Sequence, residues 1–267
     1  MPTADTVCIH FGSRHPWPVP LAWRQGRCEK KRNPVIVLHE PSTPLQVAID
    51  GPVASGKSTV ALQLANRLGF QFLDTGALYR AVAYTVLQRG VAADDADGVA
   101  HLVAEHMPAV TMDASTGLRY HIAMDGRLLH DELFSREVSQ AVSSIAAMPH
   151  VRERLIDVQR EFARDKRVVM AGRDIGTVVL PQAAFKFYLT AGLDVRVDRR
   201  QRQLQRRGIE LTQKALQAEI RARDARDQTR VVSPLVKASD ATEVDTSALS
   251  IDEVVSLLER TVRASTG

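Results

Sequence analysis

The chain has few of the features that build disulfide-rich, membrane-spanning or repeat proteins. It has two cysteines, Cys8 and Cys28, whose separation fits neither a CxxC motif nor a metal site. We therefore expect free thiols in a reducing compartment, the cytoplasm, with a disulfide or a zinc site as less favoured alternatives. No apolar run reaches about 18 residues, so we expect no membrane partner, and the lack of a secretory leader pattern disfavours secretion. No segment repeats at a period of about 20 to 50 residues, which excludes a solenoid fold.

Aromatic residues are also scarce, and none lies in the most basic part of the chain. They make up 5% of the 267 residues, whereas 45% are hydrophobic and 25% charged, as in an ordinary globular protein. Residues 194–230 contain ten Arg and one Lys against six Asp and Glu. A protein that binds single-stranded nucleic acid would place aromatic rings among such charges. We therefore expect no nucleic-acid partner, and we assign the segment to polyphosphate binding, which suits the forked guanidinium group.

Residues 1–44 differ from the rest of the chain. They hold seven of the twelve prolines and both tryptophans, and they show neither helical nor alternating periodicity. They also hold +3 of the formal net charge of +4, from six Lys and Arg against three Asp and Glu. We predict an extension without a packed core, followed by one domain over residues 45–267. An organellar transit peptide, or sequence upstream of the true start, is the alternative interpretation.

One segment, Gly51-Pro-Val-Ala-Ser-Gly-Lys-Ser58, fits the GxxxxGKS pattern of a phosphate-binding P-loop. It follows an apolar run, 45–49, and precedes an amphipathic stretch, which is the context that such a loop requires. The backbone N–H groups of the loop and the helix N-terminus attract phosphates, Lys57 reaches the β/γ oxygens, and Ser58 can ligate Mg²⁺. We expect ATP as a ligand and Mg²⁺ as a cofactor. The residues predicted to bind ATP are Gly51, Pro52, Val53, Ala54, Ser55, Gly56, Lys57, Ser58 and Thr59.

The hydrophobic pattern from Leu45 onward predicts an α/β fold, a parallel sheet flanked by helices, because short apolar runs alternate with segments of helical periodicity. The expected strands are 45–50, 71–73, 168–171, 185–189 and 241–244. The expected helices are 57–68, 75–89, 194–207, 212–227 and 251–263, in which apolar residues recur three or four apart. Between about 105 and 165 the rhythm changes to short strands at 109–112, 118–124 and 127–129, followed by helices through Ser143 and Arg152. We predict a small α+β insertion there.

Two further motifs directly follow predicted strands, where parallel sheets bind ligands. In Asp74-Thr-Gly-Ala-Leu-Tyr-Arg80, the hydroxyl of Thr75 and the guanidinium of Arg80 lie on one helix, which suits a second phosphate. In Gly172-Arg-Asp-Ile-Gly176, Arg173 and Asp174 present opposite charges at a strand end. The equally weighted alternatives are a capping threonine with a solvated arginine in the first motif, and a structural ion pair in the second.

The basic segment contains a third pattern, in which acids and arginines alternate at helical spacing. Asp224 and Asp227 interleave with Arg223, Arg226 and Arg230 three and four residues apart. One helical face can therefore carry both charges and hold them in place. A solvated, charged face is the alternative interpretation.

Taken in this order, the motifs resemble the bacterial cytidylate kinase family over about residues 45–263. The stretches GRDIGTVVLP at 172–181 and RDARDQTR at 223–230 carry the resemblance most specifically. It implies a P-loop NTPase of the nucleoside monophosphate kinase fold, with a monophosphate-binding insertion at about 105–165 and a lid at about 196–226. It also implies an ATP-dependent CMP or dCMP kinase with small-molecule substrates, which we expect to be a monomer.

The same resemblance implies roles for individual side chains. Arg80 and Arg173 would contact the acceptor phosphate, whereas Asp227 and Arg230 would bind sugar and base. The cytosine would be read by Ser143, Arg152 and Asp174. The residues expected to bind the acceptor are Thr75, Arg80, Ser143, Arg152, Arg173, Asp174, Asp227 and Arg230. Those expected to act in catalysis are Lys57, Arg173, Arg199, Arg223 and Arg226, and the expected metal ligand is Ser58.

Such a reaction needs cations rather than a general base, because an acceptor phosphate is already anionic. The eight histidines form no ligand cluster or triad spacing. Another P-loop small-molecule or nucleotide kinase is the stronger alternative. A nucleic-acid-dependent ATPase is less favoured, since the strand at 168–171 runs into Gly-Arg-Asp rather than into an acidic pair.

Overall fold

The computed structural model describes residues 44–113 and 116–265. The predicted extension therefore lies outside the described residues, apart from Pro44. The central sheet has five parallel strands in the order β2-β6-β1-β7-β8. They are β1 (Leu45–Asp50), β2 (Gln71–Asp74), β6 (Arg167–Gly172), β7 (Phe185–Thr190) and β8 (Thr242–Asp245). The prediction of an α/β fold with a parallel sheet is confirmed, and each strand lies within one residue of its predicted bounds.

Alternate side chains of the strands enter two separate cores, as the period of a strand requires. On β1, Val47 and Ile49 pack with helices α1 (Lys57–Leu68) and α8 (Ile251–Ala264). Between them, Ala48 faces the opposite side of the sheet. Since parallel strands are covered on both faces, β1 has a continuous buried apolar run at 47–49 and β6 has one at 168–171.

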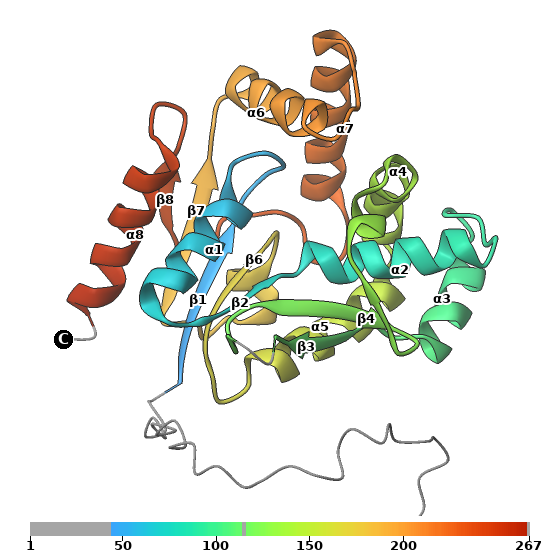
Figure 1. Ribbon diagram of the computed structural model, residues 1–267, viewed down its shortest axis with the longest axis horizontal. Helices are drawn as coiled ribbons and strands as arrows, with labels where there is room; N and C mark the ends of the chain where they lie inside the picture. The colour runs from blue at the N-terminus through green and yellow to red at the C-terminus, as the bar shows by residue number, and fades with distance from the viewer. Residues whose placement is uncertain (1–43, 114–115, 266–267) are drawn as a thin grey trace, which may run out of the picture. The chain divides into compact units, whose positions relative to one another are not determined.

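The second core lies under the helices on the other face of the sheet (Figure 1). These helices are α2 (Gly76–Gln88), α3 (Ala96–Glu105), α4 (Arg136–Ile145) and α5 (Pro149–Ala163). The sequence did not predict α3, although Asp95 begins it as an N-cap by accepting a hydrogen bond from the Gly98 N–H at 2.9 Å. Among the described residues, no helix combines the length and the apolar composition needed to cross a bilayer.

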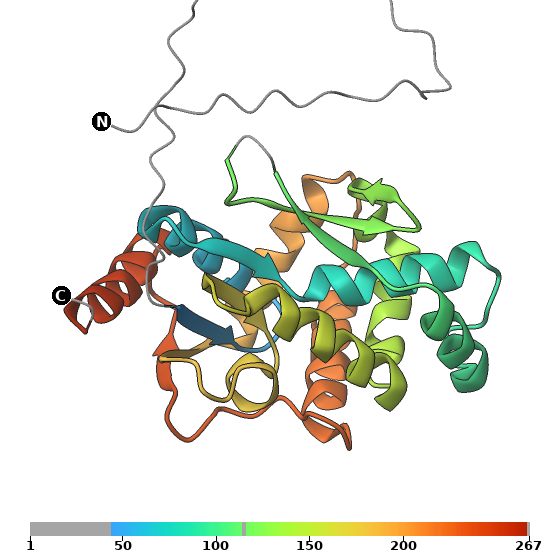
Figure 2. The ribbon, with the colours of Figure 1, turned by 90° about the horizontal axis from the view of Figure 1, so that it is seen from below.

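A small antiparallel sheet occupies the region where the rhythm of the sequence changes. It consists of β3 (Ala109–Met112), β4 (Tyr120–Met124) and β5 (Arg127–Leu129), and β4 runs beside α2 (Figure 2). The turn between β4 and β5 is Asp125-Gly126, with φ of 50° and 78°, the left-handed conformation that two-residue hairpins prefer. A 3₁₀ turn, η2 (Asp131–Phe134), connects this sheet to α4. The three predicted strands are confirmed, although β4 begins two residues later than predicted.

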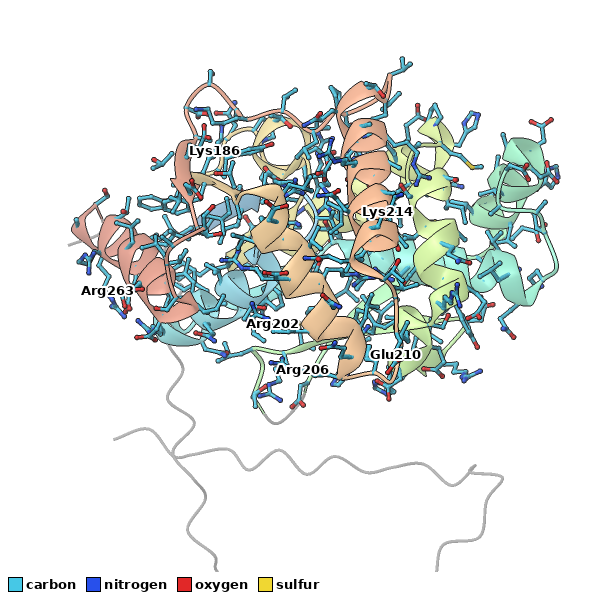
Figure 3. The ribbon with its side chains drawn as sticks, turned by 90° about the horizontal axis from the view of Figure 1, so that it is seen from above. Lys186, Arg202, Arg206, Glu210, Lys214 and Arg263 are labelled. Atoms are coloured by element: carbon cyan, nitrogen blue, oxygen red, sulfur yellow. The ribbon has the colours of Figure 1, made fainter. Side chains whose placement is uncertain are left out.

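Helices α6 (Leu193–Gln205) and α7 (Gln213–Thr229) form a hairpin beyond the carboxyl ends of the sheet strands (Figure 1). The chain turns at Gly208 with φ of +69°, and Thr212 caps α7. A small apolar cluster holds the two helices together, and its buried members are Val197, Leu204, Leu216 and Ile220. Four exposed residues mark the hairpin in Figure 3, namely Arg202 on α6, Arg206 directly after α6, Glu210 in the turn and Lys214 on α7.

Candidate active site

The predicted motifs meet at one edge of the sheet because parallel strands all end on the same side. The P-loop follows β1, the second motif begins at the end of β2, and the third begins at the end of β6. Helix α7 reaches this edge with its C-terminal half and lines a pocket there together with the ends of β2 and β6. Residues far apart in the sequence thus form a single site.

The P-loop has the backbone conformation that its glycines predict. Gly51 and Gly56 have φ of 152° and 92°, and a Cβ on Gly51 would lie 2.2 Å from the carbonyl oxygen of Leu189. Lys57 begins α1, is 6% exposed, and donates a hydrogen bond to the Pro52 carbonyl at 3.0 Å. Burial, with the nearby charge of Arg173, lowers the pKa of Lys57 well below its ordinary value. An anion inside the loop would relieve this cost.

The loop is fastened to the segment that follows β8. Thr246 is buried, and its hydroxyl donates to the Ser55 carbonyl at 3.1 Å. Arg199 of α6 donates to the hydroxyl and the carbonyl of Thr246 at 2.9 and 2.6 Å, and to the Ser55 carbonyl at 3.4 Å. The predicted catalytic Arg199 therefore lies against the P-loop.

Asp50 connects the donor loop with the end of β6. Its two carboxylate oxygens accept hydrogen bonds from the backbone N–H groups of Ile175 and Gly176, each at 2.8 Å. Burial raises the pKa of Asp50 to about 6, even though these two bonds act in the opposite direction. The sequence predicts no role for Asp50, whose signal is its place directly before the P-loop.

Arg152, Asp174 and Arg230 form a buried charged group in the pocket. The guanidinium of Arg152 donates to the Asp174 carboxylate and, at 3.1 Å, to the Ala146 carbonyl, and it stacks 5.3 Å from the centre of the Tyr79 ring. On the other side of Asp174 lies Arg230, at 3.7 Å. The predicted residue Ser143 lines the same pocket.

Several buried polar atoms of this pocket have no hydrogen-bond partner. They are the Ser143 Oγ, the Tyr79 hydroxyl, the Arg152 Nε and one terminal nitrogen of Arg230. A buried polar atom without a partner costs about 1–3 kcal/mol, so such atoms need a ligand or water. This group can therefore bind a planar molecule that offers both donors and acceptors.

Arg173 and Asp174 are adjacent, but they face different partners. The Nε of Arg173 donates to Asp227 of α7 at 2.8 Å. Burial alone would raise the pKa of Asp227, but the charges of Arg173 and Arg223 hold it below its ordinary value. Both residues therefore form ion pairs, as the structural alternative holds, but each with a partner on another element rather than with its neighbour.

Further arginines gather between α2, α6 and α7. Burial, with Arg200 nearby, lowers the pKa of Arg80 to about 10, and burial with Arg173 and Arg80 nearby lowers that of Arg223 to about 9. Within the described part of the chain, Arg80 donates to two neutral groups, the Leu133 carbonyl at 3.1 Å and the Ser139 hydroxyl at 3.0 Å, and forms no ion pair. Arg80 is half-buried and held by these contacts, which does not fit the alternative of a solvated arginine. The positive charge here exceeds the negative charge, as an anion site requires.

Other predicted residues lie outside this group or differ from their predicted surroundings. Arg226 is exposed on α7 and donates to the Ala222 carbonyl of its own helix at 3.3 Å. Thr75 occupies the N-cap position of α2, as the alternative interpretation holds, but its hydroxyl donates to the Ala171 carbonyl at 3.0 Å and makes no capping hydrogen bond. Thr59 is exposed. The roles of these three residues stay predictions.

The interleaved acids of α7 behave differently from one another. Asp227 faces Arg230, the residue directly after its own helix, at 3.9 Å, as the spacing predicts. Asp224 instead pairs with Arg196 of α6 at 2.6 Å, so the expectation that its partners lie on its own helix is wrong. Spacing along a helix cannot identify a partner on another helix. The sequence also predicts no role for Tyr79 or Thr246, although Tyr79 lies inside the second motif.

Comparison with known proteins identifies the family of the chain. The family model described as cytidylate kinase matches residues 47–264. A cytidylate kinase of Desulfitobacterium hafniense (strain Y51) is 46% identical over 211 residues, 79% of this chain and 89% of that protein. One of Nocardia farcinica (strain IFM 10152) is 46% identical over 228 residues, 84% and 97% of the two chains. One of Pelotomaculum thermopropionicum is 44% identical over 218 residues, 82% and 96% of the two chains. The chain belongs to the cytidylate kinase family.

Proposed function

We propose that this phosphotransferase moves the γ-phosphoryl group of ATP to CMP or dCMP, giving ADP and CDP or dCDP. The observation that carries the proposal is the pocket beside the P-loop, where buried polar atoms lack hydrogen-bond partners and Arg223 forms no ion pair with another described residue. A nucleoside monophosphate supplies both needs, since its base offers donors and acceptors and its phosphate is an anion.

The proposed acceptor site divides into two parts. Ser143, Arg152 and Asp174 read the cytosine, and their support is the set of unpartnered atoms around the Arg152 guanidinium. Arg80 and Arg173, with the Thr75 hydroxyl, hold the phosphate. The sugar and part of the base contact Asp227 and Arg230. Asp227 lies on α7, Arg230 directly follows that helix, and both line the pocket.

The proposed donor site is the P-loop from Gly51 to Thr59. Lys57 exchanges its hydrogen bond to the Pro52 carbonyl for phosphate oxygens, which restores charge compensation in a buried place. Arg199, Arg223 and Arg226 act from α6 and α7 on the phosphates. The chemistry needs no general base, because the acceptor oxygen is already anionic and the obstacle is repulsion between two phosphates. Cations positioned before the reaction lower that barrier.

Magnesium fits this donor site as a cofactor. In the described part of the chain, no three His, Cys, Asp or Glu side chains gather as a metal cluster. Magnesium bound with a nucleotide needs none, since it takes few protein ligands and keeps phosphate oxygens and waters. The hydroxyl of Ser58, half-buried in the first turn of α1, is the hard oxygen ligand that we assign to it. When bound, the ion neutralises charge on the transferring phosphate.

We also propose that residues of about 196–226 act as a lid and residues of about 105–165 as the monophosphate-binding insertion. The pocket encloses about 60 Å³, whereas sites for small molecules are commonly about 300–1,000 Å³. A nucleotide therefore needs the pocket to widen. Helix α7 carries Arg223 and Asp227 into the pocket, so its outward movement opens the site and its return excludes water from the transferring phosphate.

The test is ADP production by the full chain from Mg·ATP with CMP, dCMP, UMP, AMP, GMP or shikimate as acceptor. Fast turnover that depends on CMP or dCMP is the expected result. A different preferred acceptor would favour another small-molecule kinase. ATP hydrolysis that needs no acceptor and rises with added DNA or RNA would favour the ATPase alternative. The cytoplasmic location and the monomeric state stay predictions.

A further inference from the structure

A buried ion pair between α6 and α7 connects the lid helix with the P-loop. One terminal nitrogen of Arg196, Nη1, donates to the Asp224 carboxylate at 2.6 Å and to the Val53 carbonyl of the P-loop at 3.2 Å. The Nε of the same guanidinium donates to the Ala191 carbonyl, directly after β7, at 3.1 Å. Arg196 thus holds the loop, the helix and the end of a strand at once.

The pair is more than a surface contact. The side chains of Arg196 and Asp224 are 10% and 14% exposed, and the second carboxylate oxygen of Asp224 is buried without a partner. Exposed ion pairs contribute little, whereas removing one member of a buried pair leaves an unpaired, desolvated charge. The two residues should therefore act as a unit.

Asp224 lies on α7 next to two residues that line the pocket, Arg223 and Asp227. It directly follows Arg223, which is half-buried among other arginines and forms no ion pair with another described residue. One turn later comes Asp227, which bonds Arg173. Repulsion from neighbouring cations pushes Arg223 outward, so its place in the pocket needs an anchor close by on the same helix.

We propose that Arg196 and Asp224 are a positioning pair, which ties α7 to the P-loop and holds Arg223 over the transferring phosphate. This inference rests on the proposed function and adds to it two residues that touch neither substrate. Because a single guanidinium bonds both the loop carbonyl and the helix carboxylate, the donor loop and the acceptor side of α7 adopt their working positions together.

The first variant is Asp224→Asn, which keeps the size of the side chain and removes its charge. We expect kcat with CMP to fall about tenfold or more, because Arg223 loses its fixed position. The dissociation constant for ATP should change by less than about threefold, since Arg196 still bonds the P-loop. The share of ATP lost to hydrolysis should rise, because a loosely held lid admits water.

A double-mutant cycle separates this role from a general loss of stability. Arg196→Ala, Asp224→Ala and the double variant should lose similar amounts of kcat if the pair acts as a unit. Losses that multiply in the double variant would overturn the proposal. Arg221→Ala, which removes an exposed arginine of the same helix, is the matched control and should leave kcat within about twofold.

A further measurement separates failure of the Arg196–Asp224 pair from failure of the proposed function. Hydrogen exchange of α7 with and without Mg·ATP needs no acceptor, and ATP should slow the exchange in the wild type but not in Asp224→Asn. Equal protection in both proteins would overturn the pairing, whether or not CMP is phosphorylated. If Asp224→Asn does not fold, Arg196→Lys gives the same readouts, since lysine keeps the charge but cannot reproduce the fork of contacts.

Discussion

Individual residues at the end of β6 show how one short segment serves two sides of the site. Arg173 turns toward Asp227 on α7, and Asp174 turns toward Arg152 on α5. Asp50 fixes the backbone directly after them by accepting hydrogen bonds from the N–H groups of Ile175 and Gly176. Side chains with opposite charges therefore stay separate although they are neighbours in the sequence.

Replacing Lys57 by alanine should abolish phosphoryl transfer and leave the fold intact. The ammonium group is buried, and its pKa is lowered by that burial, so its removal costs the free protein little. The transition state instead loses a positioned cation, which we expect to reduce kcat by about a hundredfold or more. Steady-state turnover and circular dichroism test this, and turnover near that of the wild type would refute the P-loop assignment. Lys237→Ala is the control, because Lys237 forms an exposed pair with Glu243.

Replacing Arg152 by alanine should weaken the acceptor far more than ATP. Arg152 is 1% exposed and bonds Asp174 inside the pocket, away from the P-loop. We expect KM for CMP to rise about tenfold or more, with KM for ATP changed by less than about threefold. Equal increases for both nucleotides would contradict the proposed role. The exposed Arg154 of α5 supplies the control variant, Arg154→Ala.

Asp50 gives a pH-dependent prediction with a defined sign. The pKa of Asp50 in the fold is about 6, above its ordinary value of 3.8, so the folded protein binds the proton more tightly than the unfolded chain. Stability from this group is therefore present at low pH and is lost as pH rises between those values. The free energy of unfolding of Asp50→Asn relative to wild type should therefore rise by up to about 3 kcal/mol from pH 4 to pH 7, because only the wild type loses this contribution.

Urea denaturation at several pH values measures this shift, and Asp240 offers a control of opposite sign. A hydrogen bond from Lys186 lowers the pKa of Asp240, so its contribution is present at neutral pH and is lost as pH falls. The free energy of unfolding of Asp240→Asn relative to wild type should therefore drop as pH rises. A difference for Asp50→Asn that does not vary with pH would rule out the raised pKa.

At the scale of elements, α7 and α8 are held in different ways. Helix α8 buries four apolar residues, Val254, Val255, Leu258 and Val262, against the sheet and α1. Helix α7 buries two apolar residues, Leu216 and Ile220, together with Asp227. Because ion pairs rather than apolar burial hold its C-terminal half, α7 can move as a lid at a smaller cost than α8 could.

A cap variant of α8 should change stability without changing catalysis. Ser250 and Glu253 form a capping box, in which the serine hydroxyl accepts from the Glu253 N–H at 3.3 Å and the Glu253 carboxylate accepts from the Ser250 N–H at 2.8 Å. Ser250→Ala should lower the free energy of unfolding by about 1 kcal/mol. Urea denaturation measures this loss. A change in KM for either nucleotide would show that α8 does more than support the sheet.

At the scale of the whole molecule, positive charge is focused at the site while the formal net charge of the chain is only +4. Anions should therefore stabilise the folded protein through specific binding. Inorganic pyrophosphate at about 100 times its dissociation constant should add about 2.7 kcal/mol to the free energy of unfolding. Thermal denaturation with added pyrophosphate tests this. The stabilisation should shrink in Arg80→Ala, and an equal effect of sulfate at the same ionic strength on both proteins would indicate unspecific screening.

The sequence alone determined the local structure and the chemical class. Periodicity predicted α1 at 57–68 and β1 at 45–50 with the bounds that the structure has, because amphipathic spacing and glycine-flanked turns are local properties. The P-loop, the 172–181 stretch and the 223–230 stretch led to the family by resemblance, which the family model then matched. The helix at Ala96–Glu105 was missed, since its cap and short apolar stripe are weak signals.

The tertiary structure alone decided which charges meet. Asp224 finds Arg196 on another helix, Asp50 finds backbone groups 125 and 126 residues away, and Arg226 points to solvent although its spacing matches that of its neighbours. Helical spacing fixes only the face on which a side chain lies, and the packing of that face against other elements decides its partner. Pairing energies depend on distance and burial, which arise only when the strands of the sheet bring their carboxyl ends to one edge.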